Sequence, residues 1–477
     1  KIVADGTFQD EEAGGRLTIA PTGALIVEDK IQRSIAPNVM SGSPTQSGDI
    51  IIETTSAGQG ALMLNNDDER TQATVKLYSK GCNNGSYQFQ YFASPFNSIS
   101  SWAFDAYIYN HSETLNPEWT QLRYGEDVEA FQGLALTADG AAKNYEIAGT
   151  LASTQPHVYE LSYTDSKANN KKGTNVVGNS WSAPIQITRI DDSDFDSPSN
   201  FEGIIYIYNA GRDVLVADKV YASDGNSEPG QWQSIPVETA KTEEWAHKRQ
   251  IPAFQAFQMK VNAATEFTLN YNKHVRQEAS VGDNNYNEPL HAPRRSMRSE
   301  AVKVLRLCVE DEQVGKSYIY LCEGDQFTEE RDRGWEAQQT IGSGKYGKLY
   351  AIDQARDYMM SIARESLEGT PVGFISGLST EYTITFNETE GTYYLNDMET
   401  QQSTLIQEGE SYTFTTTKGN HPNRFIISAI PFDKPGIATG VTDLDAEAPK
   451  VQKVIYNDKL YIIRGGKVYS AEGQLVK

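Results

Sequence analysis

The residues of this chain that are best suited to chemistry form an acidic run, with carboxylates at the alternating positions Asp192, Asp194 and Asp196. Oxygen ligands at alternate positions are what a twelve-residue calcium loop supplies. Counted from Asp192, the sixth position is Ser197 and the twelfth is Gly203, where that loop needs glycine and glutamate. The spacing therefore predicts a calcium loop of another kind, bound through the three aspartates. An ordinary solvated turn is the alternative interpretation.

Other catalytic and ligand-binding patterns are missing from the sequence. The six histidines are scattered, without the short spacing that a zinc site needs. Neither a G-x-S-x-G nucleophile elbow nor a CxxC pair occurs, and carboxylates are too abundant for a glycosidase pair to be chosen among them. The sequence therefore predicts no catalytic residue and no cofactor other than calcium, and it favours a protein that is not an enzyme.

Three cysteines, Cys82, Cys308 and Cys322, are too few for a disulfide scaffold. Cys308 and Cys322 each lie in an apolar stretch, and a hairpin that turns about residues 314–316 would place them opposite each other. A disulfide between them would suit a protein outside the cytoplasm. Two buried thiols are an equally good interpretation.

The six tryptophans could stack on sugar rings in a carbohydrate-binding protein. Trp119 and Trp232 occupy matching positions in the internal repeat described below, so we expect them to be large anchors of a core. Trp245 lies in the polar segment TEEWAHKR, and it is the tryptophan that we expect to be exposed and to contact a ligand.

The composition limits the partners. The formal net charge is −22, which repels phosphate backbones and anionic lipid, so we expect no nucleic-acid partner. The chain contains no apolar stretch of the ~20 residues that a membrane-spanning helix requires. The first residue is Lys1, as a removed signal peptide would leave it, and as a shortened chain would also show.

Alternating apolar residues, frequent Gly, Asn, Asp and Ser, and 26 tyrosines predict an all-β protein of tandem β-sandwich domains. We expect an N-terminal β-rich domain, solenoid-like or sandwich (1–85); two β-sandwich repeat copies (86–165 and 166–278); a linker (279–300); a C-terminal β-sandwich (301–435); a tether (436–452); and a small β-meander (453–477).

The two repeat copies share four landmarks in the same order. The landmarks are ASPF and SAPI, AYIYN and IYIYN, Trp119 and Trp232, and AFQGLAL and AFQAFQM. The distance between matching landmarks grows along the copies, so the second copy carries insertions, which we expect in loops. A sheet as short as one copy must pack on another, so the copies predict paired sandwiches.

The final residues, KVIYNDKLYIIRGGKVYSAEGQLVK, contain three apolar stretches separated by Asn-Asp and Gly-Gly, which are tight-hairpin signals. With Tyr461, Gly466, Tyr469, Gly473 and Gln474, this segment resembles the C-terminal sorting module of cargo of the type IX secretion system of Bacteroidetes. The body, with GNSWSAPIQI, IYIYN and IPAFQAF, resembles tandem β-modules of Bacteroidales surface proteins. These resemblances imply export through the periplasm to the outer-membrane surface, and they imply no catalytic activity.

Together these observations predict an exported cell-surface protein with a structural, adhesive or assembly role. Its expected partners are the secretion or surface machinery and a glycan or a neighbouring surface protein. The competing hypothesis is a carbohydrate-binding or glycan-processing surface protein, because an array of sandwiches could serve either role.

Overall fold

In the computed structural model, the chain forms two compact units, one of residues 1–222 and 229–298 and the other of residues 223–228 and 299–477. The residues that the structure describes are 2–4, 8–10, 17–19, 24–27, 31–33, 50–55, 58–64, 71–83, 86–168, 171–209, 212–216, 219–223, 231–242, 250–275, 302–311, 315–328, 330–339, 347–432, 452–456, 459–464 and 467–470.

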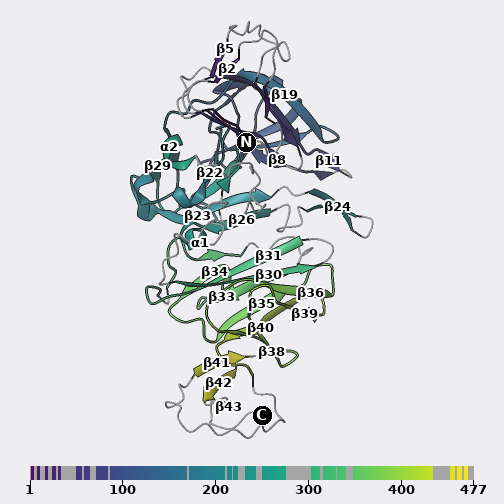
Figure 1. The fold of residues 1–477 in the computed structure, drawn as a ribbon, viewed down its shortest axis with the longest axis vertical. Helices are drawn as coiled ribbons and strands as arrows, with labels where there is room; N and C mark the ends of the chain where they lie inside the picture. Colours follow the sequence, from purple (N-terminus) through teal and green to yellow (C-terminus); the bar gives the residue numbers. More distant parts are fainter. Residues whose placement is uncertain are drawn as a thin grey trace. The chain divides into compact units, whose positions relative to one another are not determined.

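The all-β prediction is confirmed. Within the described residues, strands make up nearly all of the regular structure (Figure 1). The α-helices among them are α1 (Val237–Thr242) and α2 (Tyr271–His274), each of fewer than two turns. No described helix is both long and apolar enough to cross a membrane.

The N-terminal part of the first unit contains parallel strands. β1 (Ile2–Ala4), β4 (Ala24–Val27) and β9 (Ala61–Leu64) pair in parallel in that order. β3 (Leu17–Ile19), β6 (Ile50–Ile52) and β10 (Gln72–Ser79) form a second parallel set, and β2 (Phe8–Asp10) pairs in parallel with β5 (Ile31–Arg33). Parallel pairing of strands from successive strand-turn-strand units is the arrangement expected of a solenoid-like domain.

Strand β9 lies between two hydrophobic cores. All four of its residues are buried. Leu62 and Leu64 contribute to the core around the first repeat copy, whereas Ala61 and Met63 contribute to the core around the second. Successive side chains of a strand point to opposite faces, so a short apolar strand without polar alternation is what a position between two cores requires.

The two repeat copies have the same strand topology. In each copy a four-stranded sheet has its strands in the sequence order first, fourth, second, third. In copy one these strands are β13 (Gln90–Phe92), β18 (Leu134–Ala138), β15 (Ala106–His111) and β16 (Trp119–Gln121). In copy two they are β21 (Thr174–Gly178), β28 (Ala256–Val261), β23 (Phe201–Asn209) and β26 (Gln231–Pro236).

Two further strand pairs recur in both copies. One pair joins β14 (Ser98–Ser100) to β17 (Asp127–Glu129) in copy one and β22 (Ile185–Gln186) to β27 (Gln250–Ile251) in copy two. The other pair joins β10 to β19 (Lys143–Thr150) in copy one and β20 (His157–Leu161) to β29 (Thr265–Leu269) in copy two. Because β10 and β20 precede residues 86 and 166, we propose that the copies span residues 72–150 and 157–269.

The copies interlock through one matching phenylalanine from each. Phe131 and Phe254 have φ angles of 64° and 59°, which are unusual for a bulky residue. Phe131, from copy one, lies in the core of copy two, with its ring 5.7 Å from that of Trp181, whereas Phe254, from copy two, lies in the core of copy one. Their carbonyl groups accept equivalent hydrogen bonds, from Gly178 N at 3.0 Å and from Ala93 N at 2.9 Å. The exchange is therefore reciprocal.

The second unit contains one large sheet (Figure 1). Its strands, in spatial order, are β38 (Gln402–Leu405), β37 (Tyr394–Asp397), β40 (Asn420–Ser428), β35 (Thr370–Ile375), β33 (Lys348–Ile352), β34 (Tyr358–Arg364), β31 (Gly315–Glu323), β30 (Lys303–Asp311), β36 (Glu381–Thr389) and β39 (Ser411–Thr415), with β32 (Ala337–Gln338) paired to β34. The first and last strands of this order are joined by residues 406–410 alone, so the sheet curls round until it is nearly closed. Its inner side holds a continuous core that includes Leu307, Phe374 and Phe425.

The hairpin that carries Cys308 and Cys322 forms, but the two cysteines do not lie opposite each other, so the interpretation as two buried thiols holds and the disulfide does not. In the antiparallel register of β30 and β31, Cys308 lies opposite Tyr318 and Cys322 lies opposite Val304. Cys308 and Cys322 are both buried, at 2% and 0% exposed. The register runs to the pair of Asp311 and Gly315, whereas opposed cysteines would require a register centred two residues later in the chain.

The C-terminal residues form the predicted meander. β41 (Gln452–Tyr456), β42 (Lys459–Arg464) and β43 (Lys467–Ser470) pair antiparallel in chain order. The Asn-Asp and Gly-Gly turns between them lie outside the described residues.

Candidate functional site

The acidic run forms a compact turn that contacts a lysine. Asp191 caps the 3₁₀ turn Asp192–Asp194: its Oδ1 accepts from Ser193 N at 2.9 Å, and its own N donates to Asp194 Oδ2 at 2.9 Å. Lys273 Nζ lies 2.9 Å from Asp191 Oδ1 and 2.7 Å from Asp194 Oδ1. The ammonium group thus lies between two carboxylates and neutralises part of the charge that a bound cation would neutralise.

Asp194 and Asp196 have further partners. Asp194 Oδ2 also lies 3.1 Å from His274 Nε2. Asp196 Oδ1 accepts from Glu266 N at 2.8 Å and from the Thr265 hydroxyl. Burial would raise the pKa of Asp191, but bonds from Ser193 and Lys273 outweigh it and lower that pKa to about 2. Among the described residues no group of three or more acidic, His or Cys side chains is arranged to hold a metal ion, and calcium binding stays a prediction.

The matching tryptophans lie where the two copies meet. The ring of Tyr91 is centred 5.4 Å from that of Trp119, and 4.5 Å from the rings of Trp232 and Tyr208. All four side chains are partly buried. They bring one aromatic group from each copy against a shared neighbour, so Trp119 and Trp232 contribute to packing between the copies. Trp245, the predicted ligand contact, lies outside the described residues.

An aromatic pair that the sequence did not single out is exposed in copy one. Trp102 and Tyr124 are 63% and 59% exposed, with ring centroids 3.9 Å apart and planes at 62°. The small and polar neighbours of Trp102 in SISSWAF, and the Tyr-Gly turn sequence, were the available signals. These two residues are the largest exposed aromatic feature that the described residues provide.

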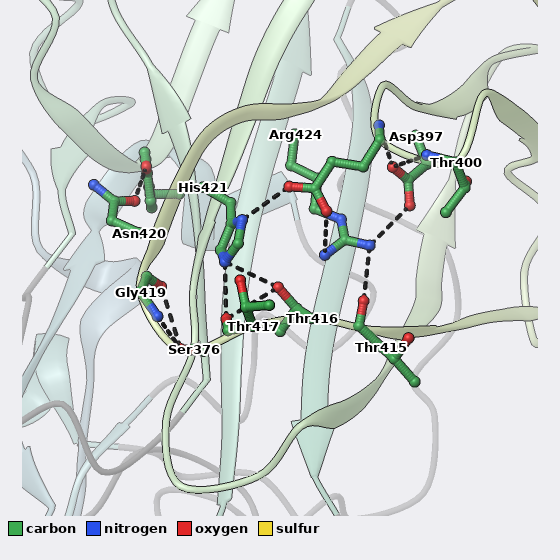
Figure 2. A network of polar contacts seen from close by, with 12 residues as sticks. Ser376, Asp397, Thr400, Thr415, Thr416, Thr417, Gly419, Asn420, His421 and Arg424 are labelled. Carbon is green, nitrogen blue, oxygen red and sulfur yellow. Dashed lines mark hydrogen bonds and ion pairs between the residues drawn. The ribbon is translucent and has the colours of Figure 1, made fainter.

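A buried polar network in the second unit joins β37, β39 and β40 (Figure 2). Arg424 Nη2 lies 3.2 Å from Asp397 Oδ2, and both side chains are 1% exposed. Tyr412 donates to the same oxygen at 2.8 Å, and the guanidinium lies 4.4 Å from the centre of the Phe414 ring. Removing any one partner would leave a buried charge uncompensated, which strongly destabilises a protein.

His421 extends this network toward the surface (Figure 2). Its Nδ1 lies 2.8 Å from Glu399 Oε1, while its Nε2 lies 2.9 Å from both the Thr416 hydroxyl and the Thr417 carbonyl oxygen. A hydroxyl, an imidazole and a carboxylate in line are the parts of an activated nucleophile. Here, however, both ring nitrogens face oxygens that only accept, the Glu399 carboxylate at Nδ1 and the Thr417 carbonyl at Nε2. Nε2 is therefore not placed simply to take the Thr416 proton, and we interpret the network as a brace between strands.

The predicted sorting residues are described only in part. Tyr461 lies in β42 opposite Ser470, and Tyr469 lies in β43 opposite Ile462. Gly466, Gly473 and Gln474 lie outside the described residues.

The fold is that of a β-protein built from a duplicated module and a large curled sheet, a class whose exposed loops and strand edges are the natural binding surfaces. The chain belongs to the family described as "Domain of unknown function (DUF8693)", whose model matches residues 7–428. It is similar to the minor fimbrium subunit Mfa5 of Porphyromonas gingivalis, with 23% identity over 431 residues. That match covers 85% of this chain and 34% of the relative, so the chain spans about a third of its relative's length. No solved structure matches the chain.

Proposed function

We propose that this chain belongs to a cell-surface protein with a structural or adhesive role in a fimbrium-like assembly. The observation that carries the proposal is the similarity to a minor fimbrium subunit, which runs along 85% of the chain. The interlocked copies and the curled sheet support it, because they hold loops on rigid scaffolds suited to extended contacts. The proposed partners are other subunits of the same surface assembly.

The experiment is co-purification with surface filaments. Fimbriae would be sheared from intact producing cells, purified and analysed by mass spectrometry, with the sheared cell bodies as the matched control. We expect peptides of this chain in the filament fraction, and antibody labelling of intact cells. A chain confined to the cell interior would contradict the proposal.

We further propose that residues 453–477 direct export by a type IX-like route. The support is the resemblance of the terminal segment, together with its three-stranded meander. A variant lacking these residues should remain in the periplasm, whereas a variant with substitutions confined to residues 436–452 should still reach the surface. Unchanged surface delivery of the truncated variant would overturn this route and would leave the surface role intact.

A further inference from the structure

The exposed side chains of Trp102 and Tyr124 come from two turns that are hydrogen-bonded to each other. Ser101 N donates to Glu126 O at 2.9 Å, and the Ser101 hydroxyl accepts from Gly125 N at 2.9 Å. The 3₁₀ turn Ser101–Ala103 is thereby tied to the turn between β16 and β17. The two turns that present the aromatic side chains are thus joined by hydrogen bonds, so less ordering is needed when a ligand binds.

Gly125 is adapted to the indole ring. Its φ is +96°, and a Cβ at this position would lie 2.6 Å from Trp102 Nε1. A side chain there would displace the indole from its place beside Tyr124. The glycine therefore serves the turn and the aromatic pair together.

Copy two is built differently around the matching turn. There the corresponding 3₁₀ turn, Ile187–Arg189, is contacted by α1, a helix inserted between β26 and β27. Ile187, Val237 and Ala240 are 0%, 4% and 1% exposed. In register, Ile187 matches Ser101, which is also buried, and Trp102 matches Thr188, which is partly buried. Copy two thus has a helix against its turn and a small polar residue at the matching position, whereas copy one has no helix in the described residues between β16 and β17 and presents a large exposed ring.

The size and surroundings of the open surface indicate its ligand. Two rings at these exposures offer on the order of 250 Å² of contact area. A stable protein interface needs about 800 Å² from each partner, so the pair alone suits a small ligand better than a protein. Arg123, Glu126 and Asp127 are exposed and lie within three residues of Tyr124 along the chain, and their charged groups can donate to or accept from hydroxyl groups.

We propose that Trp102 and Tyr124 form a saccharide-binding site. One ring stacks on the C–H face of a pyranose, whose weakly positive hydrogens suit the negative face of an aromatic ring. Glu126 and Asp127 accept from sugar hydroxyls, and their charge disfavours anionic sugars, so the ligand is a neutral or amino sugar. The inference rests on the proposed adhesive role and supplies its ligand class.

The test is binding of the purified chain to an array of neutral, amino, sialylated and sulfated oligosaccharides, followed by titration of the best-bound compound. We expect binding to neutral or amino sugars, reduced roughly tenfold or more in Trp102→Ala and in Tyr124→Ala. Tyr124→Phe, which keeps the ring, should retain most of the affinity. Leu378→Ala, which changes a residue that is 43% exposed in the second unit, is the matched control and should bind normally.

A flat array, or binding that Trp102→Ala leaves unchanged, would overturn the inference. Preference for sialylated or sulfated sugars would also overturn it. Loss of co-purification with filaments in Trp102→Ala, without saccharide binding by the parent chain, would assign the pair to a protein contact instead. In each of these cases the presence of the parent chain in the filament fraction decides the proposed surface role separately.

Discussion

Copy one and copy two have the same strands in the same order, yet they differ at the surface. Each copy places a phenylalanine with positive φ in the core of the other, and each has a four-stranded sheet with two flanking strand pairs. Copy two adds β24 (Arg212–Val216), β25 (Lys219–Ser223) and α1 between its shared strands. The comparison teaches that packing between the copies preserves the module, while the loops are free to become a cover or a binding surface.

The contact between the copies is also asymmetric at one point. The equivalent donors to the two phenylalanine carbonyl groups are Ala93 and Gly178. A Cβ on Gly178 would lie 2.5 Å from Ala93 Cβ and 2.4 Å from Gln132 O. One of the two positions must lack a side chain for the copies to approach this closely, and in this sequence it is the one in copy two.

The largest loss of stability is expected when one of the two exchanged phenylalanines is removed. Phe254→Ala should lower the free energy of unfolding of the first unit by roughly 3–5 kcal/mol, because a fully buried aromatic ring is removed from a packed core. Phe131→Ala should cost somewhat less, since Phe131 is 8% exposed against 1% for Phe254. Urea unfolding measures both, with Tyr124→Ala as the exposed control. A change below about 1 kcal/mol in either variant would refute the interlocking.

The next largest loss of stability is expected when a side chain is added at Gly178, where the two copies approach each other closely. Gly178→Ala should destabilise the first unit by about 1–3 kcal/mol, because the added methyl group meets Ala93 and the backbone of Gln132. Adding Ala93→Gly should restore part of the loss, which a double-mutant cycle detects. Simple additivity of the two changes would show that these positions do not share one space.

Acid should weaken the junction between the copies. Burial lowers the pKa of His111 and of His157 to about 4, and His157 stacks on Phe131 with ring centroids 4.2 Å apart. The unfolded chain, with histidine pKa near 6.5, binds more protons between pH 6.5 and 4. The free energy of unfolding should therefore fall as pH falls through this window, by roughly 1 kcal/mol per pH unit for His111 and by less for His157, whose charge solvent screens more.

Urea midpoints at several pH values measure this slope, and His157→Gln should flatten it. An equally steep profile in the variants His157→Gln and His111→Gln would show that other groups carry the acid sensitivity.

The smallest expected effect on stability is at the aromatic pair. Trp102→Ala and Tyr124→Ala should change the free energy of unfolding by less than about 0.5 kcal/mol, because both side chains are more than half exposed. The melting temperature of each variant, measured against the parent chain, checks this. A large loss would mean that the rings hold the two turns together, and their exposure would then have a structural reason.

Local patterns predicted much of the fold. The alternating stretches gave the strands of both copies, and the terminal turn residues gave the meander. The predicted bounds put β10 in the N-terminal domain and β20 in copy one, because their partners β19 and β29 lie 64 or more residues away along the chain at the nearest pairs. The exchange of Phe131 and Phe254 is likewise a contact between distant segments, which periodicity does not report.

The site was less predictable than the fold. Alternating aspartates are typical of calcium loops. The neighbouring sequence does not predict that Lys273 contacts them, because Lys273 lies 79 residues beyond Asp194. The register of β30 and β31 depends on where the turn begins, so the pairing of Cys308 with Cys322 could not be derived from apolar alternation. The exposure of Trp102 depends on which distant segments pack near it, and local alternation does not report that.

Hydroxyl-radical footprinting on intact producing cells tests the account most directly, since it reports surface location and side-chain exposure together. We predict strong oxidation of Trp102 and Tyr124 on unbroken cells, with Trp181, which is 1% exposed, protected until the protein is unfolded. Labelling of Trp102 only after lysis, or equal labelling of Trp102 and Trp181, would contradict an exported module whose first copy is open to its surroundings.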